Sequence, residues 1–329
     1  MGISGSAAAR RAGAIVGALG ALVSSIAVGA TATADARPAC PAVSVTVAKP
    51  APSPTGWAEN LTYDSVGSAA DGPGVTAGNL WVSRTFGNVV ERFDESGRRT
   101  ASVPVTAPGA VRQGPDGLLY VASGDTTANM FPGTPLTGQV LRMDPTAAVP
   151  RAEVFASGLG MPNGMAFDAA GRLYVADGNL GVVRIDRAGR IDEPWSRMSP
   201  KNLAPSATVN GTSTNGIVVV GNDLYVTLTT SLTGRVLRVP IDDPAATTVA
   251  ADVTAPAPGL LDDLAALDAR TLVVALTTGQ IATIDLPTRR VCVAGVGQPV
   301  TAIVQRPGMP NRLLAGTEGG AILDVTLRR

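Results

Sequence analysis

Residues 162–186 read PNGMAFDAAGRLYVADGNLGVVRID, and this stretch contains the unit from which the fold is built. The tight-turn sequence Asp168–Gly171 precedes the strand-like run Leu173–Ala176, and a glycine then opens a second alternating run, Gly181–Asp186. Turn residues between short runs of β-branched and aromatic residues are typical of antiparallel strands joined by hairpins. The stretch therefore predicts consecutive strands of one small sheet.

The same phrase recurs along the chain at intervals of roughly 40 to 55 residues, the period of propeller blades with four strands each. Its apolar runs begin at Leu80, Leu119, Leu173, Leu224, Leu272 and Leu313. No segment of the mature chain shows a sustained helical period. We therefore predict an all-β fold, a six-bladed β-propeller of four-stranded antiparallel blades that spans residues 37–329.

The first part of the chain has the features of an export signal. Arg10 and Arg11 precede an apolar run over residues 12–30, and small residues at Ala34 and Ala36 offer cleavage sites. This order predicts a secretory signal peptide over residues 1–36 and an extracellular mature protein. The arginine pair also suggests twin-arginine export, although the residues that follow it match poorly. A retained membrane anchor is the alternative.

The ring of blades needs one further strand to close. The sixth copy ends with the strand 323–327, one strand short, whereas residues 43–48 near the mature N-terminus alternate as a strand does. We predict that this N-terminal strand completes the last blade and hides an otherwise exposed sheet edge. An even cysteine count in an exported chain suggests a disulfide between Cys40 and Cys292 that locks the closure. Two unrelated buried thiols are the alternative.

Composition excludes several classes of function. Lys and Arg together number 26 and so do Asp and Glu, so the formal net charge is zero and nucleic acid is not an expected partner. Histidine is absent. A Ser-His-Asp or Cys-His catalytic apparatus is therefore excluded, as are zinc sites that need imidazole. Catalysis would depend on carboxylates, hydroxyls or a metal. We expect no membrane contact after signal cleavage, and a monomer.

One position in each copy, at the start of its innermost strand, forms a pattern. Around the ring it reads Glu59, Gly109, Asn163, Asn215, Asp262 and Val300, and Asp263 follows directly in the fifth copy. Repeats around one axis bring equivalent positions together, and converging carboxylate and amide oxygens are the ligands of a hard cation such as calcium. Taken singly, an Asn-Gly pair is ordinarily a turn signal. The joint pattern predicts a metal site.

From about Trp57 to the C-terminus the chain resembles the calcium-dependent six-bladed propellers of the regucalcin (senescence marker protein), gluconolactonase and paraoxonase group. The resemblance rests on a first-blade Glu, the motif Pro-Asn-Gly-x-Ala-Phe-Asp at 162–168, a second Asn-Gly and a late Asp. It implies a calcium site, or a site for another divalent cation. The residues it implies as ligands are Glu59, Asn163, Asn215, Asp262 and Asp263.

The resemblance also implies an activity, the hydrolysis of a small-molecule lactone or ester. By analogy with the sugar lactonases Asp262 would be the general base, with Asp263 in reserve. The alternative is that both aspartates are only ligands, because a bound cation weakens a carboxylate as a base. The loop 123–138 carries Met130, Phe131 and Pro132 at its tip, which favours a hydrophobic substrate over a free sugar acid.

Two departures keep other functions open. Paraoxonases carry a histidine at the second-blade ring position, where this chain has Gly109. The segment around it, residues 108–113, does not match the substrate-holding residues of the sugar lactonases. A non-catalytic secreted propeller with structural calcium is therefore one alternative function. A relative of strictosidine synthase, which condenses an amine with an aldehyde, is another.

Overall fold

The computed structural model describes residues 40–52, 56–65, 77–201 and 206–328. These residues belong to one compact unit, Cys40–Arg329, that consists almost wholly of β-strands. The signal peptide predicted over residues 1–36 lies outside the described residues. Within them, no helix has the length and apolar character needed to cross a membrane.

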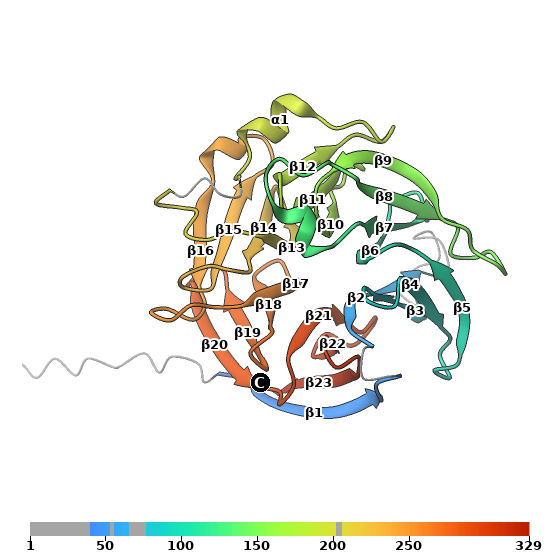
Figure 1. Ribbon diagram of the computed structural model, residues 1–329. Helices are drawn as coiled ribbons and strands as arrows, with labels where there is room; N and C mark the ends of the chain where they lie inside the picture. Colours follow the sequence, from blue (N-terminus) through green and yellow to red (C-terminus); the bar gives the residue numbers. More distant parts are fainter. Residues whose placement is uncertain (1–39, 53–55, 66–76, 202–205, 329) are drawn as a thin grey trace, which may run out of the picture. The chain divides into compact units, whose positions relative to one another are not determined.

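Six small antiparallel sheets surround a central channel (Figure 1), so the predicted six-bladed β-propeller is confirmed. Blades 1 to 3 have the strands β2 (Ala58–Ser65), β3 (Ala77–Arg84), β4 (Val89–Phe93), β5 (Arg99–Pro104), β6 (Pro108–Gln113), β7 (Leu119–Ser123), β8 (Gly138–Met143), β9 (Glu153–Leu159), β10 (Pro162–Phe167), β11 (Leu173–Asp177) and β12 (Gly181–Ile185). Blades 4 to 6 have β13 (Thr214–Val220), β14 (Asp223–Leu228), β15 (Arg235–Pro240), β16 (Thr248–Asp252), β17 (Leu261–Asp268), β18 (Thr271–Leu276), β19 (Gln280–Asp285), β20 (Arg290–Gly295), β21 (Val300–Gln305), β22 (Arg312–Thr317), β23 (Ile322–Arg328) and β1 (Ala42–Lys49).

Blade 3 differs from the predicted four strands. Its sheet contains only β10, β11 and β12 in the described part of the chain, extended by one isolated bridge between Ile185 and Ile191. The short helix α1 (Glu193–Met198) follows and packs against β12, where a fourth strand was expected to pair. Asp192 caps this helix, and Trp195 anchors it by donating from Nε1 to the Ile241 carbonyl at 2.7 Å.

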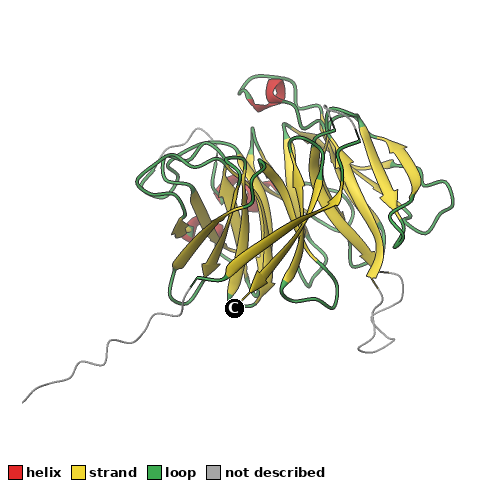
Figure 2. Cartoon of the chain, turned by 90° about the horizontal axis from the view of Figure 1, so that it is seen from below, coloured by secondary structure: helices red, strands yellow, loops and turns green. Residues whose placement is uncertain are grey.

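The core lies between blades. Each of six buried clusters combines residues of two neighbouring blades, as where Tyr174 of β11 packs with Leu224 and Val226 of β14. This follows from the alternation of side chains along each strand, which gives every blade two apolar faces. The strands stand side by side in Figure 2, with the connecting loops at the two ends of the channel.

The N-terminal strand closes the ring as predicted. β1 pairs antiparallel with β23, with Val43 opposite Leu327 and Val45 opposite Val325. In Figure 1 it lies outside β23 as the outermost strand of blade 6. The predicted disulfide is also confirmed: Cys40, two residues before β1, is bonded to Cys292 in β20 of blade 5, with 5.6 Å between their Cα atoms. The bond thus connects the outer strands of the last two blades.

Candidate metal centre in the central channel

The structure places the ring positions at one level of the channel. In blades 1 to 5 each is the second residue of an innermost strand, and in blade 6 it is the first, Val300. We call the end of the channel where these strands begin the upper mouth. The connection between β2 and β3, residues 66–76, lies outside the described residues. The equivalence inferred from the repeats therefore holds around the ring.

The two Asn-Gly pairs are not turns. Asn163 and Gly164 lie inside β10, and Asn215 and Gly216 lie inside β13. A Cβ atom on Gly164 would lie 2.1 Å from the Asn215 carbonyl oxygen, so any side chain there would push neighbouring strands apart. The glycine permits close packing at the narrow axis, and the asparagine beside it is directed to the channel.

Glu59, Asn163 and Asp125 form one buried group. Asn163 donates from Nδ2 to Glu59 Oε1 at 2.9 Å and to Asp125 Oδ2 at 3.2 Å. The indole N–H of Trp57 donates to Glu59 Oε2. Asp125 follows β7 of blade 2 and is 9% exposed. Asp125 thus adds an oxygen from blade 2 to those that Glu59 of blade 1 and Asn163 of blade 3 bring to the channel.

Asn215 and Asp262 each contribute one buried side-chain oxygen, Oδ1, that has no hydrogen-bond partner among the described residues. The Asn215 amide nitrogen is oriented by Thr229, to which it donates at 3.0 Å. A buried acceptor without a partner costs roughly 1–3 kcal/mol. These two atoms point to a cation that accepts their lone pairs.

The electrostatics of the group are unfavourable without positive charge. Burial raises the pKa of Glu59 to about 7, against the hydrogen bonds from Trp57 and Asn163, which lower it. Burial also raises the pKa of Asp125 well above its usual range, as does the charge of Glu59. The pKa of Asp262 is raised by burial and by the charges of Glu59, Asp263 and Asp125. Several buried carboxyl groups in one place need protons or a cation.

These residues fit a divalent cation of the calcium type. We refer to Glu59, Asp125, Asn163, Asn215 and Asp262 as the upper cluster. In the described part of the chain, no three His, Cys, Asp or Glu side chains form a metal site by themselves. A site here would therefore need the asparagine oxygens, and a mixed carboxylate and amide set is what calcium accepts. The partnerless oxygens of Asn215 and Asp262 support that donor set.

Asp263 has a different environment from Asp262. Its carboxylate accepts from Asn60 Nδ2 at 3.1 Å, from Arg112 Nη2 at 3.2 Å and from the Ile303 backbone at 3.3 Å. Burial raises its pKa, and Arg112 opposes that shift. Arg112 also donates to Asn60 Oδ1 and to the Leu61 carbonyl. Asn60, Arg112 and Asp263 form a lower layer that connects blades 1, 2 and 5 beneath the upper cluster.

Replacing Arg112 by Met is expected to destabilise the protein by about 3 kcal/mol. The reason is that the buried Asp263 carboxylate loses the guanidinium group that balances its charge. The Asp263 side chain is 3% exposed. The measurement is the free energy of unfolding from urea titration. Arg190→Met is the matched control, since the Arg190 side chain of the pair with Asp186 is 80% exposed. A surface pair of that kind contributes at most about 1 kcal/mol. Equal losses in the two variants would contradict the prediction.

Gly109 leaves no space for a side chain at the second-blade ring position. A Cβ atom there would lie 2.9 Å from the Pro162 carbonyl oxygen and 3.1 Å from Asn163 Cα. A histidine at this position, as in the paraoxonase pattern, would therefore require the neighbouring blade to shift. Blade 2 contributes Asp125 from a loop instead.

The loop 123–138 and a second loop, which leads through residues 206–213 into β13, lie at the upper mouth. The first contains the short helix η1 (Thr127–Met130), and Asn179 of blade 3 holds it by donating to the carbonyls of Asn129 and Phe131. Ser213 of the second loop contacts Met130 Sδ at 2.8 Å. Phe131 remains 55% exposed. The loops therefore bring apolar groups to the mouth above the upper cluster.

Sequence reasoning missed Asp125 and the role of Arg112. Both lie away from the single ring position that the repeats align. Asp125 had a usable signal, because it follows the second strand of blade 2 much as Asp177 ends that of blade 3. Arg112 had none, since its partners Asn60 and Asp263 are 52 and 151 residues away along the chain.

Comparison with known proteins supports the fold. No protein-family model matches the chain, and no curated protein matches it. Among solved structures, regucalcin from Agrobacterium tumefaciens, described as calcium-binding, is 16% identical with a TM-score of 0.57, over 84% of this chain and 92% of that one. A putative gluconolactonase is 14% identical with a TM-score of 0.57, over 87% and 93%.

A third similar structure carries a different activity. Virginiamycin B lyase from Staphylococcus aureus, an inactive variant with quinupristin, is 14% identical with a TM-score of 0.55, over 87% of this chain and 100% of that one. At these identities the likeness shows the fold alone, a β-propeller.

Proposed function

We propose that the protein is a secreted, calcium-dependent hydrolase of small lactones or esters. The observation that carries the proposal is the pair of buried, partnerless oxygens, Asn215 Oδ1 and Asp262 Oδ1, beside the carboxyl groups of Glu59 and Asp125. The calcium-binding regucalcin and the putative gluconolactonase of the same fold add weight to it. The disulfide is consistent with an oxidising, extracellular location.

The upper cluster would hold the metal, and calcium is our first choice among divalent cations. When bound, the ion supplies positive charge that polarises a lactone or ester carbonyl. Glu59, Asn163, Asn215 and Asp262 serve as ligands in this proposal, and Asp125 joins them. Trp57 orients Glu59 through its indole N–H.

Asp262 is the proposed general base. In this proposal its buried Oδ1 binds the cation, and its other oxygen, Oδ2, accepts a proton from an attacking water. For Asp263 we propose a supporting role in place of the ligand and base roles predicted from the sequence. Its carboxylate is already occupied by Asn60, Arg112 and Ile303, and this fixes the strand that carries Asp262.

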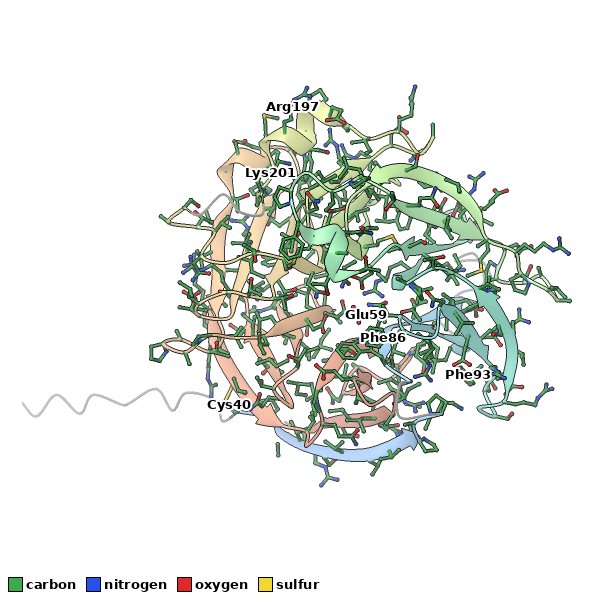
Figure 3. The ribbon with its side chains drawn as sticks, viewed as in Figure 1. Cys40, Glu59, Phe86, Phe93, Arg197 and Lys201 are labelled. Atoms are coloured by element: carbon green, nitrogen blue, oxygen red, sulfur yellow. A yellow bond between two sulfur atoms is a disulfide. The ribbon has the colours of Figure 1, made fainter. Side chains whose placement is uncertain are left out.

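The proposed substrate has an apolar part. Phe86 is 65% exposed and stacks edge-on against Trp57, with 5.2 Å between the ring centroids. Trp57 contacts both Phe86 and Glu59, the two labelled in Figure 3, and Phe131 is also exposed on the mouth loops. We propose that these exposed apolar side chains contact an acyl chain of the substrate.

The test is hydrolysis of a panel of sugar lactones, acyl lactones and aryl esters by the mature protein after chelator treatment. We expect turnover to fall at least tenfold on stripping and to return with calcium, faster for acyl lactones than for sugar lactones. Magnesium at the same concentration is the control for the ion. A chelated protein that is as active as the calcium-loaded one would refute the proposal.

A calcium-bound protein that hydrolyses nothing would favour a non-catalytic propeller with structural calcium. The observation in favour of that second function is Gly109, which leaves blade 2 without a ring side chain. Calcium binding is read separately from activity, as a rise in melting temperature. A rise without turnover therefore separates the two functions.

A further inference from the structure

A second space lies at the opposite end of the channel from the upper cluster. It is a cavity of about 390 Å³, and all six innermost strands contribute to it. Its lining residues come two to five residues after the ring positions of their strands, from Ile217 to Gln305. Since a strand rises about 3.3 Å per residue, this cavity begins roughly 7 Å below the ring level. We call it the lower cavity.

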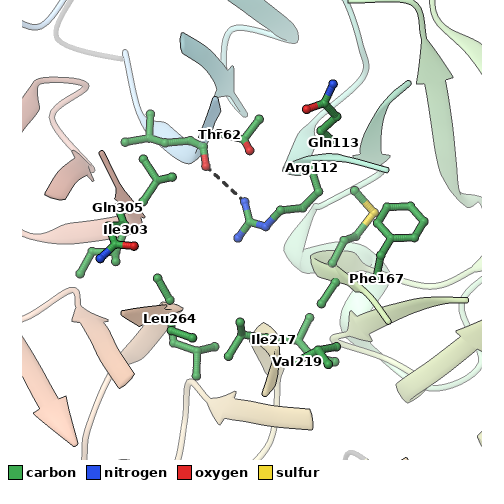
Figure 4. Close-up of a pocket in the computed structure, with 16 residues that line it drawn as sticks. Thr62, Arg112, Gln113, Phe167, Ile217, Val219, Leu264, Ile303 and Gln305 are labelled. Atoms are coloured by element: carbon green, nitrogen blue, oxygen red, sulfur yellow. Dashed lines mark hydrogen bonds between the residues drawn. The ribbon is translucent and has the colours of Figure 1, made fainter. Parts of the chain in front are cut away.

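The walls of the lower cavity are mainly apolar. Ile217, Leu264 and Ile303 come from three different blades, and Phe167 comes from a fourth. Figure 4 shows their side chains around the space, with Arg112 extending into its middle. A volume of this size is within the range of small-molecule sites, which combine apolar walls with a few polar groups.

Arg112 supplies a fixed hydrogen-bond donor in this setting. Its Nη1 donates to the Leu61 and Val111 carbonyls at 3.2 and 2.9 Å, and its Nη2 donates to Asp263. Its Nε–H has no acceptor among the described residues. The side chain is 20% exposed, on the side of the lower cavity that it lines. The guanidinium is therefore held rigidly while one donor remains available.

The charge of Arg112 is already balanced by Asp263. An anionic ligand would give up its hydration without meeting net positive charge, which is costly in an apolar cavity. A neutral carbonyl oxygen, by contrast, needs only one donor. The chemistry of the lower cavity thus favours an uncharged ligand.

We propose that the lower cavity binds a small uncharged organic molecule with an apolar body and one carbonyl group. The apolar body lies among Phe167, Ile217, Leu264 and Ile303, and the carbonyl oxygen accepts from Arg112 Nε. The site is separate from the upper cluster, because the lower layer of Asn60, Arg112 and Asp263 lies between them. It requires neither calcium nor hydrolysis.

The test uses 2-octanone, a neutral ketone that a hydrolase cannot cleave, with octanoate as the anionic counterpart. Binding to the mature, chelated protein is measured by ligand-observed NMR saturation transfer. We expect saturable binding of the ketone and at least tenfold weaker binding of octanoate. Absence of saturable ketone binding, or octanoate binding that is equally tight, would overturn the proposal.

Cavity-filling variants locate the site. Ala266→Trp is expected to weaken ketone binding at least tenfold, because Ala266 lines the lower cavity. Ala188→Trp is the matched control, an exposed position that does not line it. Ala265→Phe fills the same space and replaces Ala266→Trp if that variant does not fold. Unchanged binding in the folded filling variant would also overturn the proposal.

Failure here is distinguishable from failure of the proposed function. Ketone binding is measured without calcium, and lactone turnover is measured with it. The filling variants change no residue of the upper cluster, so they should retain any calcium-dependent turnover of the parent protein.

Discussion

Asp262→Asn should lower the calcium-restored hydrolysis of the best panel substrate by about 10³-fold, within the range that a general base contributes. Asparagine keeps the size of the side chain and one oxygen, but it cannot accept a proton at neutral pH. The measurement is kcat/KM with the mature protein at saturating calcium. The expected loss is therefore chemical and does not arise from a change in packing.

The physical basis is the environment of Asp262. Burial and the charges of Glu59, Asp263 and Asp125 raise the pKa of its carboxyl group, and Oδ1 has no hydrogen-bond donor among the described residues. Burial and these negative charges raise the proton affinity of the carboxylate and so oppose the lowering that a bound cation causes. The carboxylate needs this proton affinity to take a proton from an attacking water molecule.

Two comparisons make the Asp262→Asn result interpretable. Asp243→Asn, an equal change at an exposed site, should leave turnover unchanged. The melting-temperature rise on adding calcium shows whether Asp262→Asn still binds the ion. If the variant binds calcium and retains turnover, Asp262 is not the base. If it has lost calcium binding as well, its role as a ligand accounts for the loss.

Removal of the disulfide should have the largest effect on stability. In the double variant with Cys40→Ser and Cys292→Ser we expect the free energy of unfolding to fall by about 5 kcal/mol. This value follows from the loop-closure entropy for the sequence separation of 252 residues. The measurement is urea unfolding of the mature protein under non-reducing conditions.

The location of the bond explains why little else would compensate. No residue of β1 is fully buried, and Val47 is 56% exposed. Two interactions therefore keep β1 in place: its backbone pairing with β23, and the disulfide that joins Cys40 to blade 5. Without the bond, β1 can separate and leave an open sheet edge.

Wild-type protein treated with a reductant is the matched control for the double variant. It should lose a similar free energy, and it contains no substitution. A loss below about 1 kcal/mol in both samples would show that pairing of β1 with β23 closes the ring unaided. A loss in the variant alone would attribute the effect to the serines instead of to the bond.

Much of the fold could be predicted because its signals are local and repeated. The runs that begin at Leu80, Leu119 and Leu173 each carry the same alternation and turn chemistry, so six copies reinforce one interpretation. Ring closure by residues 43–48 followed from counting strands. Blade 3 was the exception: the sequence from Asp192 onward forms a capped helix, and packing of Trp195 against Tyr174 replaced the expected fourth strand.

The candidate site could be predicted only in part. Glu59, Asn163, Asn215 and Asp262 occur once per blade at equivalent positions, and the symmetry of the ring brings equivalent positions to one level. The repeats carry no information about side chains that reach the axis from elsewhere. Asp125 enters from a loop, and it was therefore missed.

The amino-acid sequence by itself determined the six blades, the closing strand, the cysteine pair and the ring of oxygen-bearing residues, because periodic patterning and strand counting need no coordinates. Only the tertiary structure decided the separate roles of the neighbours Asp262 and Asp263. The pairing of β17 with β18 has a register irregularity between Leu261 and Leu264, so the two aspartates in it do not share one environment. One carboxylate therefore keeps a free oxygen in the upper cluster, while the other is paired with Arg112, 151 residues distant in the chain.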